Sequence, residues 1–402
     1  MRAPGDGWSA CLEAPSLIGH RRRGNLAPDK SERRDKRARM KIVHVIDSLQ
    51  VGGTENQFLA LLPELARDHE IVLVTLDDRD RTGLGELPVS RRYSLAFSGP
   101  KSLLRCAIKL RKIIAAEKPD LVRSQLYWSS IIARLATPKS VPLIFSIHST
   151  MSADGYVKNR AALWLERLTY RPRHRLLSVS RHALEDFDRH VGLKGPADVL
   201  TNFVRPEFLI HESKRRLFKP PFRLIAVGNL KPVKNFAVII DAMRELSREI
   251  QLDIYGEGSE RPALEGRIAG SGVNVRLMGA TNELWNVLPR YDLFVMPSLY
   301  EGCPNAAIEA MAVGLPLLLS DIPVMHEVSQ GNALFFDPND PRSLSHVLRR
   351  VENGEVDLQA MADRGREIVR THHLKADYLK RLNATYADAV ASRPKAADGE
   401  RR

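Results

Sequence analysis

The chain has 402 residues, which at roughly 150 residues per domain indicates two domains, or at most three. Hydrophobic residues make up 44% of the chain and charged residues 27%, a composition that is typical of folded globular proteins and excludes disordered and fibrous classes. The net charge of +13 suits a polyanionic partner, such as a nucleic acid, anionic lipid headgroups or a phosphorylated substrate, and does not choose among them.

The first 39 residues differ from the rest of the chain. They hold ten Lys or Arg against five Asp or Glu, and they show no apolar periodicity. Met40 directly precedes the first clear strand pattern, so we expect residues 1–39 to be a disordered basic arm or an upstream over-extension of the reading frame. The segment has no continuous apolar run of the kind a secretory signal needs. The longest uncharged apolar stretch of the chain, residues 310–319, is shorter than the ~20 residues of a membrane-spanning helix.

These observations predict a cytoplasmic protein. The three cysteines, Cys11, Cys106 and Cys303, stand far apart and form no CxxC pair. Their spacing argues against a disulfide framework and against a zinc site, and it indicates a reducing compartment.

From Lys41 onward, β-rich runs alternate with helical patterns, which is typical of βαβ units and a parallel sheet. In the first half we expect strands at 42–46, 71–76, 120–126, 143–148 and 176–179, and helices at 56–67, 103–117 and 161–170. The alternation then restarts, with strands at 224–227, 252–255, 275–278, 293–296, 316–319 and 334–336, and helices at 236–246, 260–269 and 306–313. The sequence therefore predicts an α/β protein with two doubly wound, Rossmann-like halves.

The domain boundaries follow from composition. We expect an N-terminal domain at 40–205, a basic, proline-punctuated linker at 206–221, a C-terminal domain at 222–374, a last helix at 375–392 that crosses back to the N-terminal domain, and a polar tail at 393–402. In doubly wound folds, ligands bind at the carboxyl ends of the strands. Two facing halves therefore place two ligand-binding crevices on one central cleft.

The most informative segment is 297–311, which reads as a strand, a tight loop and a helix opened by Pro304. The first backbone N–H groups of such a helix, from Asn305 onward, can bind an anion. Glu301 and Glu309 can reach the same pocket and accept hydrogen bonds from sugar or ribose hydroxyls. On spacing alone, a loop acid and a solvated helix acid remain an alternative reading of this pair.

This segment closely resembles the E-x7-E signature of the GT4-type glycosyltransferases, retaining enzymes of the GT-B fold that use nucleotide sugars. The resemblance implies a catalytic Glu301 and donor contacts from Gly302, Cys303, Pro304, Asn305 and Glu309.

The similarity extends from Met40 to about Val390. Gly52 and Gly53 resemble the family's glycine-rich loop after the first strand, which approaches the donor diphosphate and the acceptor. His148 resembles the histidine that lines the cleft at the end of a strand. Lys234 matches the lysine that holds the donor phosphates, and the resemblance implies a catalytic role for both side chains.

One position departs from the family pattern. Where relatives have an arginine that holds the diphosphate, this chain has Asn229, a neutral amide in place of a charged fork. Either Lys231 or the helix N-terminus compensates, or the diphosphate is held less tightly.

The resemblance implies no cofactor beyond the nucleotide-sugar co-substrate and no essential metal. In the front-face mechanism proposed for the family, the departing phosphate oxygen takes the acceptor's proton, so no strong protein base is required. Asp78 and Asp80 form a D-x-D pattern, which we interpret as a solvated turn rather than a metal site.

The expected acceptor is a lipid-linked or polysaccharide glycan. The helix at 103–117 has a lysine and arginine stripe beside an apolar stripe that includes Leu104. We expect the apolar stripe to pack on the sheet, while the basic stripe can face an anionic membrane, which suggests peripheral association with the inner face of the cytoplasmic membrane.

Other functional classes fit less well. A dinucleotide-dependent oxidoreductase lacks its G-x-G-x-x-G loop here, and a nucleic-acid binder lacks a recognisable module, so no nucleic-acid partner is expected. Because of Asn229, a degenerate GT-B protein that binds nucleotide sugar without turnover remains the alternative.

Overall fold

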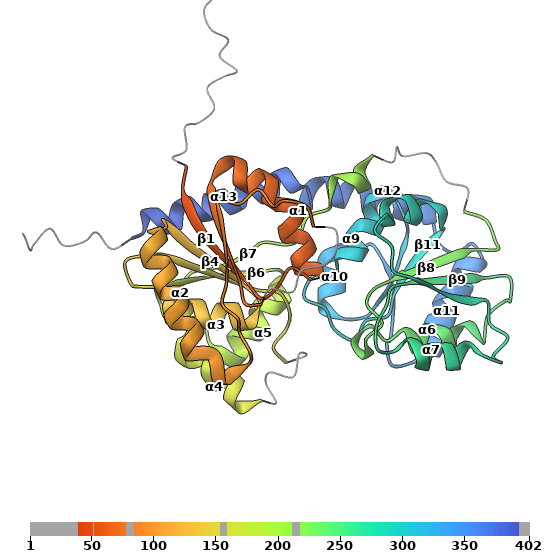
Figure 1. Ribbon diagram of the computed structural model, residues 1–402. Helices are drawn as coiled ribbons and strands as arrows, with labels where there is room; N and C mark the ends of the chain where they lie inside the picture. The colour runs from red at the N-terminus through yellow and green to blue at the C-terminus, as the bar shows by residue number, and fades with distance from the viewer. Residues whose placement is uncertain (1–38, 51, 78–83, 153–158, 211–217, 394–402) are drawn as a thin grey trace, which may run out of the picture. The chain divides into compact units, whose positions relative to one another are not determined.

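The computed structural model describes residues 39–50, 52–77, 84–152, 159–210 and 218–393 (Figure 1). The expected arm, apart from its last residue, and the tail beyond Arg393 lie outside these ranges, as do the D-x-D loop and part of the linker. No helix within the described ranges is long and apolar enough to cross a bilayer.

The first half is built on a seven-stranded sheet in the order β3-β2-β1-β4-β5-β6-β7, with every neighbouring pair parallel. The strands are β1 (Lys41–Ile46), β2 (Glu70–Thr75), β3 (Arg91–Ser94), β4 (Leu121–Gln125), β5 (Leu143–Ile147), β6 (His174–Ser178) and β7 (Ala197–Val199). The five expected strands are confirmed to within a few residues. The edge strands β3 and β7 were missed because they are short and not buried, so they lack a continuous apolar run.

Helices cover both faces of this sheet. They are α1 (Gly53–Asp68), α2 (Leu103–Glu117), α3 (Tyr127–Ala136), α4 (Arg160–Thr169) and α5 (Arg181–Val191). Apolar side chains of α1 pack with Ile42 and Ile46 on one face, whereas α2 and α3 pack with Val43 and Val45 on the other. This alternation along β1 follows from the two-residue period of a strand.

The second half contains a six-stranded parallel sheet in the order β10-β9-β8-β11-β12-β13. Its strands are β8 (Arg223–Val227), β9 (Gln251–Tyr255), β10 (Val275–Gly279), β11 (Leu293–Met296), β12 (Leu317–Ser320) and β13 (Leu334–Phe336). All six were predicted. The α/β class with two doubly wound halves is thereby confirmed.

The helices of the second half again form two layers. They are α6 (Phe236–Met243), α7 (Arg261–Ile268), α8 (Leu284–Val287), α9 (Asn305–Ala312), α10 (Pro323–Ser329), α11 (Pro341–Glu352) and α12 (Leu358–His372). Helices α6, α7 and α11 share one apolar cluster, and α8, α9, α10 and α12 share the other. Helix α9, which opens beside Pro304, is therefore held against the sheet by its own buried face.

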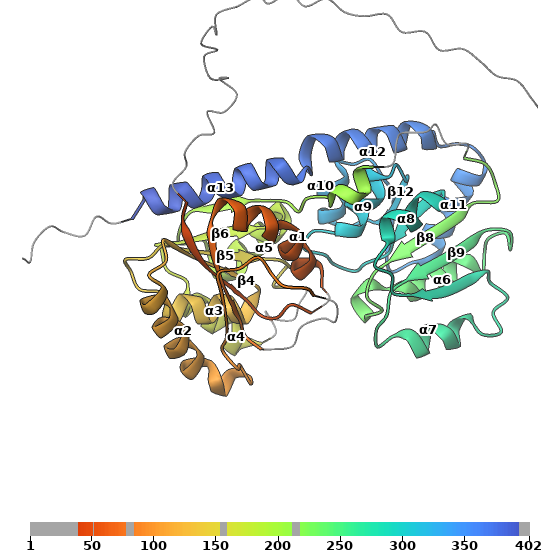
Figure 2. The same ribbon diagram turned by 45° about the horizontal axis from the view of Figure 1, so that its top comes forward.

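The last helix, α13 (Lys375–Ala391), leaves the second half and packs on the first sheet (Figure 2). Its Leu382 and Tyr386 are buried in the cluster that contains α1 and β1. The ion pair of Lys375 with Glu64 and the bond of Asn383 to His69 add polar links. The end of the chain thus connects the two halves a second time, beside the segment 200–210.

Candidate functional site

A cavity of about 410 Å³ lies where the strand ends of the two halves meet, and residues from both halves line it. Its size is within the usual range for small-molecule sites. The sequence-predicted residues that line it are Gly52, Gly53, His148, Asn229, Lys234, Glu301, Gly302, Cys303, Pro304, Asn305 and Glu309. The structure therefore brings every predicted site residue to one cavity, although these residues are separated by more than 250 positions in the chain.

The first charged pair in the cavity joins Lys234 to Glu301. The Lys234 Nζ atom lies 2.5 Å from Glu301 Oε1, and both side chains are largely buried. Lys234 ends the single turn Pro232–Lys234 that precedes α6, and Glu301 follows β11, so each comes from a strand-to-helix connection of the second sheet. A cation held this way is preorganised for an anionic ligand in the cavity.

The second pair joins Arg205 to Glu309. The guanidinium Nε and Nη2 atoms of Arg205 both lie 3.3 Å from Glu309 Oε1, and the guanidinium also packs over the rings of Phe208 and Trp285. Burial raises the pKa of Glu309 to about 7, while the charge and hydrogen bonds of Arg205 oppose that rise. The Glu309 carboxyl group therefore changes ionisation near neutral pH.

Arg205 is the residue that the sequence analysis missed. It was placed at the end of the N-terminal domain, directly before the linker, with no role in the site, yet it lines the cavity and supplies a second cation there. Lys231, one of the alternatives considered for compensating Asn229, is exposed and is not among the residues that line the cavity. The signal that could have identified Arg205 is its charge at the junction between the N-terminal domain and the linker, where the two halves meet.

Backbone loops of the two halves meet at the cavity. The side chain of Asn305 accepts a hydrogen bond from Asn202 Nδ2 at 2.7 Å and donates one to the carbonyl of Gly53 at 3.3 Å. A Cβ atom on Gly302 would lie 1.9 Å from the carbonyl oxygen of His148, so only glycine permits this close approach. The family signature loop and the glycine-rich loop are thus in direct contact.

Cys303 is not suited to nucleophilic chemistry. Burial raises the pKa of its thiol to about 12, with smaller contributions from Glu327 and Glu301 in the same direction. A thiol with a raised pKa remains protonated and unreactive at neutral pH. This environment is that of a small structural side chain in the loop.

His148 lines both the large cavity and a smaller one of about 150 Å³, whose lining residues all come from the first half. The small cavity is lined by polar side chains of Asp47, Ser130, Arg134 and Ser146, among others. Burial raises the pKa of Asp47, against the hydrogen bonds from Ser129 that lower it. The polar groups among its lining residues offer hydrogen-bonding partners for hydroxyl groups of a second ligand.

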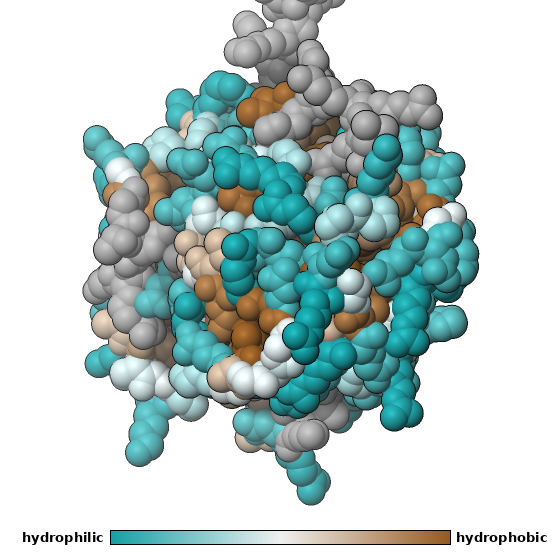
Figure 3. Space-filling view, turned by 90° about the vertical axis from the view of Figure 1, so that its right-hand side faces the viewer, coloured by the Kyte–Doolittle hydropathy of each residue, from teal (hydrophilic) through white to brown (hydrophobic). Residues whose placement is uncertain are grey.

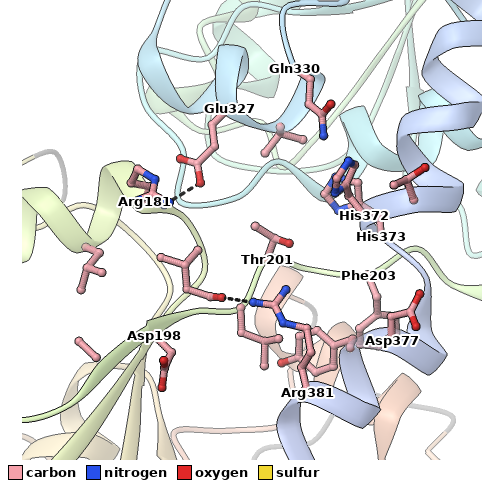
Figure 4. Close-up of a pocket in the computed structure, with 17 residues that line it drawn as sticks. Arg181, Asp198, Thr201, Phe203, Glu327, Gln330, His372, His373, Asp377 and Arg381 are labelled. Carbon is pink, nitrogen blue, oxygen red and sulfur yellow. Dashed lines mark hydrogen bonds between the residues drawn. The ribbon is translucent and has the colours of Figure 1, made fainter. Parts of the chain in front are cut away.

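A third cavity, of about 580 Å³, lies beside the segment that connects the halves (Figure 4). Here Glu327 of α10 accepts hydrogen bonds from the backbone N–H groups of Arg181 and His182, the first residues of α5. Arg381 of α13 donates to the carbonyl of Val199. A carboxylate at a helix N-terminus is stabilising, so this contact links the two halves away from the charged pairs.

Comparison with known families identifies both halves of the chain. The family described as "Glycosyltransferase Family 4" matches residues 51–208, and the family described as "Glycosyl transferases group 1" matches residues 221–353. The two matches follow one another along the chain with the linker region between them.

Individual relatives agree with these matches. A Campylobacter jejuni N-acetylgalactosaminyltransferase that acts on a diphospho-undecaprenol substrate is 24% identical over 294 residues, which cover 69% of this chain and 79% of the relative. Among solved structures, sucrose-phosphate synthase from Thermosynechococcus elongatus has a TM-score of 0.75 at 17% identity, covering 88% of this chain and all of that one. Anabaena HepE in complex with UDP-glucose has a TM-score of 0.71 at 17% identity, covering 87% of this chain and all of that one.

Proposed function

The chain belongs to the group 1 glycosyltransferases of family 4 and has their GT-B fold, and from this premise we propose that it transfers a sugar from a nucleoside diphosphate sugar to a glycan or lipid-linked acceptor with retention of configuration. Glycosyl transfer is the activity of the family. The donor class, the stereochemistry and the acceptor are our proposals.

The observation that supports a nucleotide-sugar donor is the pairing of two cations with two carboxylates in one cavity. Lys234 and Arg205 supply positive charge, and the N-terminus of α9 adds backbone N–H groups beside them. Cleaving the bond between the anomeric carbon and phosphate builds negative charge on the diphosphate, which preorganised cations stabilise. Glu309 supplies acceptor oxygens for ribose hydroxyls. The complex of the structural neighbour HepE with UDP-glucose is consistent with a donor of this class.

Retention of the anomeric configuration is supported by the weak basicity of the side chains that could take the acceptor's proton. Glu301 is occupied by Lys234, and burial together with the charge of Arg123 lowers the pKa of His148 to about 3. Neither group readily takes a proton from an acceptor hydroxyl at neutral pH. In our proposal the departing phosphate oxygen takes that proton while Glu301 and His148 position sugar hydroxyls, and no metal ion is required.

The acceptor is proposed to bind in the first half, with a hydroxyl group near His148 and the small cavity that this residue lines. This half also exposes large apolar side chains on α2 and α4, namely Leu104, Ile108, Trp164 and Leu168. The exposure of Leu104, 71%, corrects the expectation that it packs on the sheet. Helix α3, whose Leu135 is 43% exposed, contacts both α2 and α4, so the three helices form one surface (Figure 1).

We propose that this surface, defined by α2, α3 and α4, rests on an anionic membrane. Lysine and arginine residues of α2 and α4 lie beside its apolar side chains, among them Arg105, Lys112, Arg160 and Arg167. Apolar and basic groups together favour anionic lipid interfaces. On the face of the second half seen in Figure 3, apolar areas are broken up by hydrophilic side chains. A membrane-bound first half would receive a lipid-linked acceptor from the bilayer.

The donor proposal is tested by thermal unfolding of the full chain with UDP-, GDP- and ADP-sugars, because a ligand that binds only the folded state raises the unfolding temperature. The sugar that stabilises the chain is then used in transfer assays. We expect Lys234→Ala to lower transfer by about 10²- to 10³-fold, the usual cost of one preorganised charge partner. Lys231→Ala, an exposed lysine of the same loop, is the matched control.

Three outcomes would contradict the proposal or part of it. Near-normal transfer by Lys234→Ala would show that Lys234 does not hold the diphosphate. Strict dependence on added divalent metal in chelator-treated protein would show that the mechanism is not metal-independent. Donor binding without transfer to any glycan acceptor would favour the degenerate binding protein that the amide at Asn229 leaves open.

A further inference from the structure

Three polar side chains form a diagonal across the first sheet. His44 of β1 is in register with Arg123 of β4, and Gln125 lies two residues further along that strand. Gln125 is in register with Ser146 of β5, and His148 lies two residues beyond. Because residues two apart on a strand point to the same side, His44, Gln125 and His148 share one face of the sheet.

Two hydrogen bonds join the three side chains of this diagonal. His44 Nε2 lies 2.8 Å from Gln125 Oε1, and Gln125 Nε2 lies 3.2 Å from His148 Nε2. His44 and Gln125 are buried, and the His44 ring stacks on Phe58 of α1 with 4.2 Å between ring centroids. Burial and stacking leave little room for either ring or amide to reorient.

The position of the protons follows from one unpaired atom. Within the part of the chain that the structure describes, the buried His44 Nδ1 atom has no hydrogen-bond partner. A buried N–H group without an acceptor is rarer than an acceptor without a donor, so Nδ1 is the unprotonated nitrogen of this ring. The proton of His44 is then on Nε2 and is donated to Gln125 Oε1.

The orientation of the Gln125 amide follows in turn. Its oxygen accepts from His44, so its NH₂ group faces His148 Nε2 and donates to it. A ring nitrogen that accepts a hydrogen bond cannot hold a proton in the neutral state, which leaves Nδ1 to hold the proton of His148. The opposite orientation of the amide would place an N–H group on His44 Nδ1 with no acceptor.

We propose that Gln125, oriented by His44, is a positioning residue that fixes His148 as the neutral tautomer protonated on Nδ1. Because His148 lines both the large and the small cavity, this tautomer presents an N–H donor, rather than a base, to a ligand oxygen. This consequence for sugar transfer rests on the proposed function, whereas the tautomer itself does not. Arg123, buried on the neighbouring strand, opposes a second proton on the ring.

The tautomer is read by ¹⁵N NMR of histidine-labelled full-length protein, since protonated and unprotonated ring nitrogens have well-separated shifts and couple differently to the ring protons. The His148 signals are assigned by their loss in His148→Gln. We expect Nδ1 protonated and Nε2 unprotonated at neutral pH. A proton on Nε2 alone, or on both nitrogens, in the wild-type protein overturns the proposal.

Two variants test the role of Gln125. In Gln125→Glu a carboxylate replaces the donating amide, so Nε2 of His148 should gain a proton. In Gln125→Met the side chain keeps its length but loses the donor, and the two tautomers should mix. Gln359→Glu, the same change on the surface of α12, is the control and should leave the His148 signals unchanged. Unaltered His148 signals in both Gln125 variants would show that Gln125 does not set the tautomer.

The variants also separate this proposal from the proposed function. We expect Gln125→Met to lower the transfer rate by about tenfold or more with little change in donor affinity, because a preorganised donor is lost. If no donor supports transfer but the wild-type tautomer is as expected, the proposed function fails and the positioning role stands. If transfer is normal but the proton of His148 is on Nε2, the positioning role of Gln125 fails and the proposed function stands.

Discussion

The ionisation of Glu309 should control donor affinity near neutral pH. Burial raises the pKa of this carboxyl group to about 7, and Arg205 limits the rise. If ribose hydroxyls donate to the carboxylate, the ionised form is the one competent to bind. About one tenth of the protein is ionised at Glu309 at pH 6 and about nine tenths at pH 8, so the apparent Kd should fall about tenfold between these values. Binding below pH 7 should also release protons.

The raised pKa of Glu309 affects folding stability in the opposite direction: donor affinity increases as pH rises, whereas the free energy of unfolding decreases. The folded-state pKa lies above the unfolded value of 4.5, so the folded protein holds the proton more tightly between pH 4.5 and pH 7. Stability contributed by this group is therefore present at low pH and is lost as pH rises through that window. One pKa unit corresponds to about 1.4 kcal/mol, which gives a loss of about 3 kcal/mol as an upper limit. The Glu309 side chain is only 12% exposed, so solvent screening is small.

Isothermal titration of a UDP-sugar in buffers of different ionisation enthalpy measures both the affinity and the number of protons released. Glu309→Gln is the comparison, since its amide still accepts a hydrogen bond but cannot ionise. We expect its donor affinity to be independent of pH and weaker than wild type at pH 8. The free energy of unfolding of this variant, measured in urea, should increase relative to that of the wild-type protein as pH rises from 5 to 8. Parallel wild-type and variant profiles in both measurements would refute this role of Glu309.

Two further predictions concern Arg205 and the membrane surface. Arg205→Ala should weaken donor binding by tenfold or more, because it removes a cation and leaves Glu309 unpaired. Adding Asn229→Arg, which restores the family's arginine, should recover part of the lost donor affinity in the same calorimetric assay. No recovery would show that positions 205 and 229 contact different parts of the donor. Leu104→Ser with Ile108→Ser should reduce sedimentation with vesicles that contain anionic lipid, and binding should weaken in high salt. Met278→Ser, an exposed apolar residue of the second half, is the matched control, and equal binding by all three proteins would exclude this surface.

The sequence predicted the parallel sheets well because most of their strands are short segments rich in apolar residues that alternate with helical patterns. Strands such as β2 and β11 are mostly apolar, whereas Asp253 interrupts β9 and Arg276 interrupts β10, and the regular alternation still located them. The short edge strands β3 and β7 have exposed or half-buried residues, and their pairing depends on neighbours distant in the chain. The crossing of helix α13 back to the first half was predicted because the second sheet already has enough helices to cover it, so the apolar face of α13 needs another partner.

The site was predicted only as far as family motifs extend. Glu301, Glu309, Lys234 and His148 lie in recognisable segments, so the resemblance placed them correctly around one cavity. Arg205 lies outside those segments, and its contact with Glu309 spans 104 residues. Such a pair depends on the packing of two halves, which periodicity and spacing do not describe.

The diagonal behind His148 shows why a strand can conceal function. Arg123, Ser124 and Gln125 are consecutive polar residues in a strand that is buried along its whole length. Burying a polar side chain is unfavourable unless it is hydrogen-bonded, so three in succession indicate either partners within the sheet or a site at its end. Gln125 has both, with His44 on one side and the cavity-lining His148 on the other. A buried polar residue at the carboxyl end of a parallel strand is therefore informative even where no motif marks it.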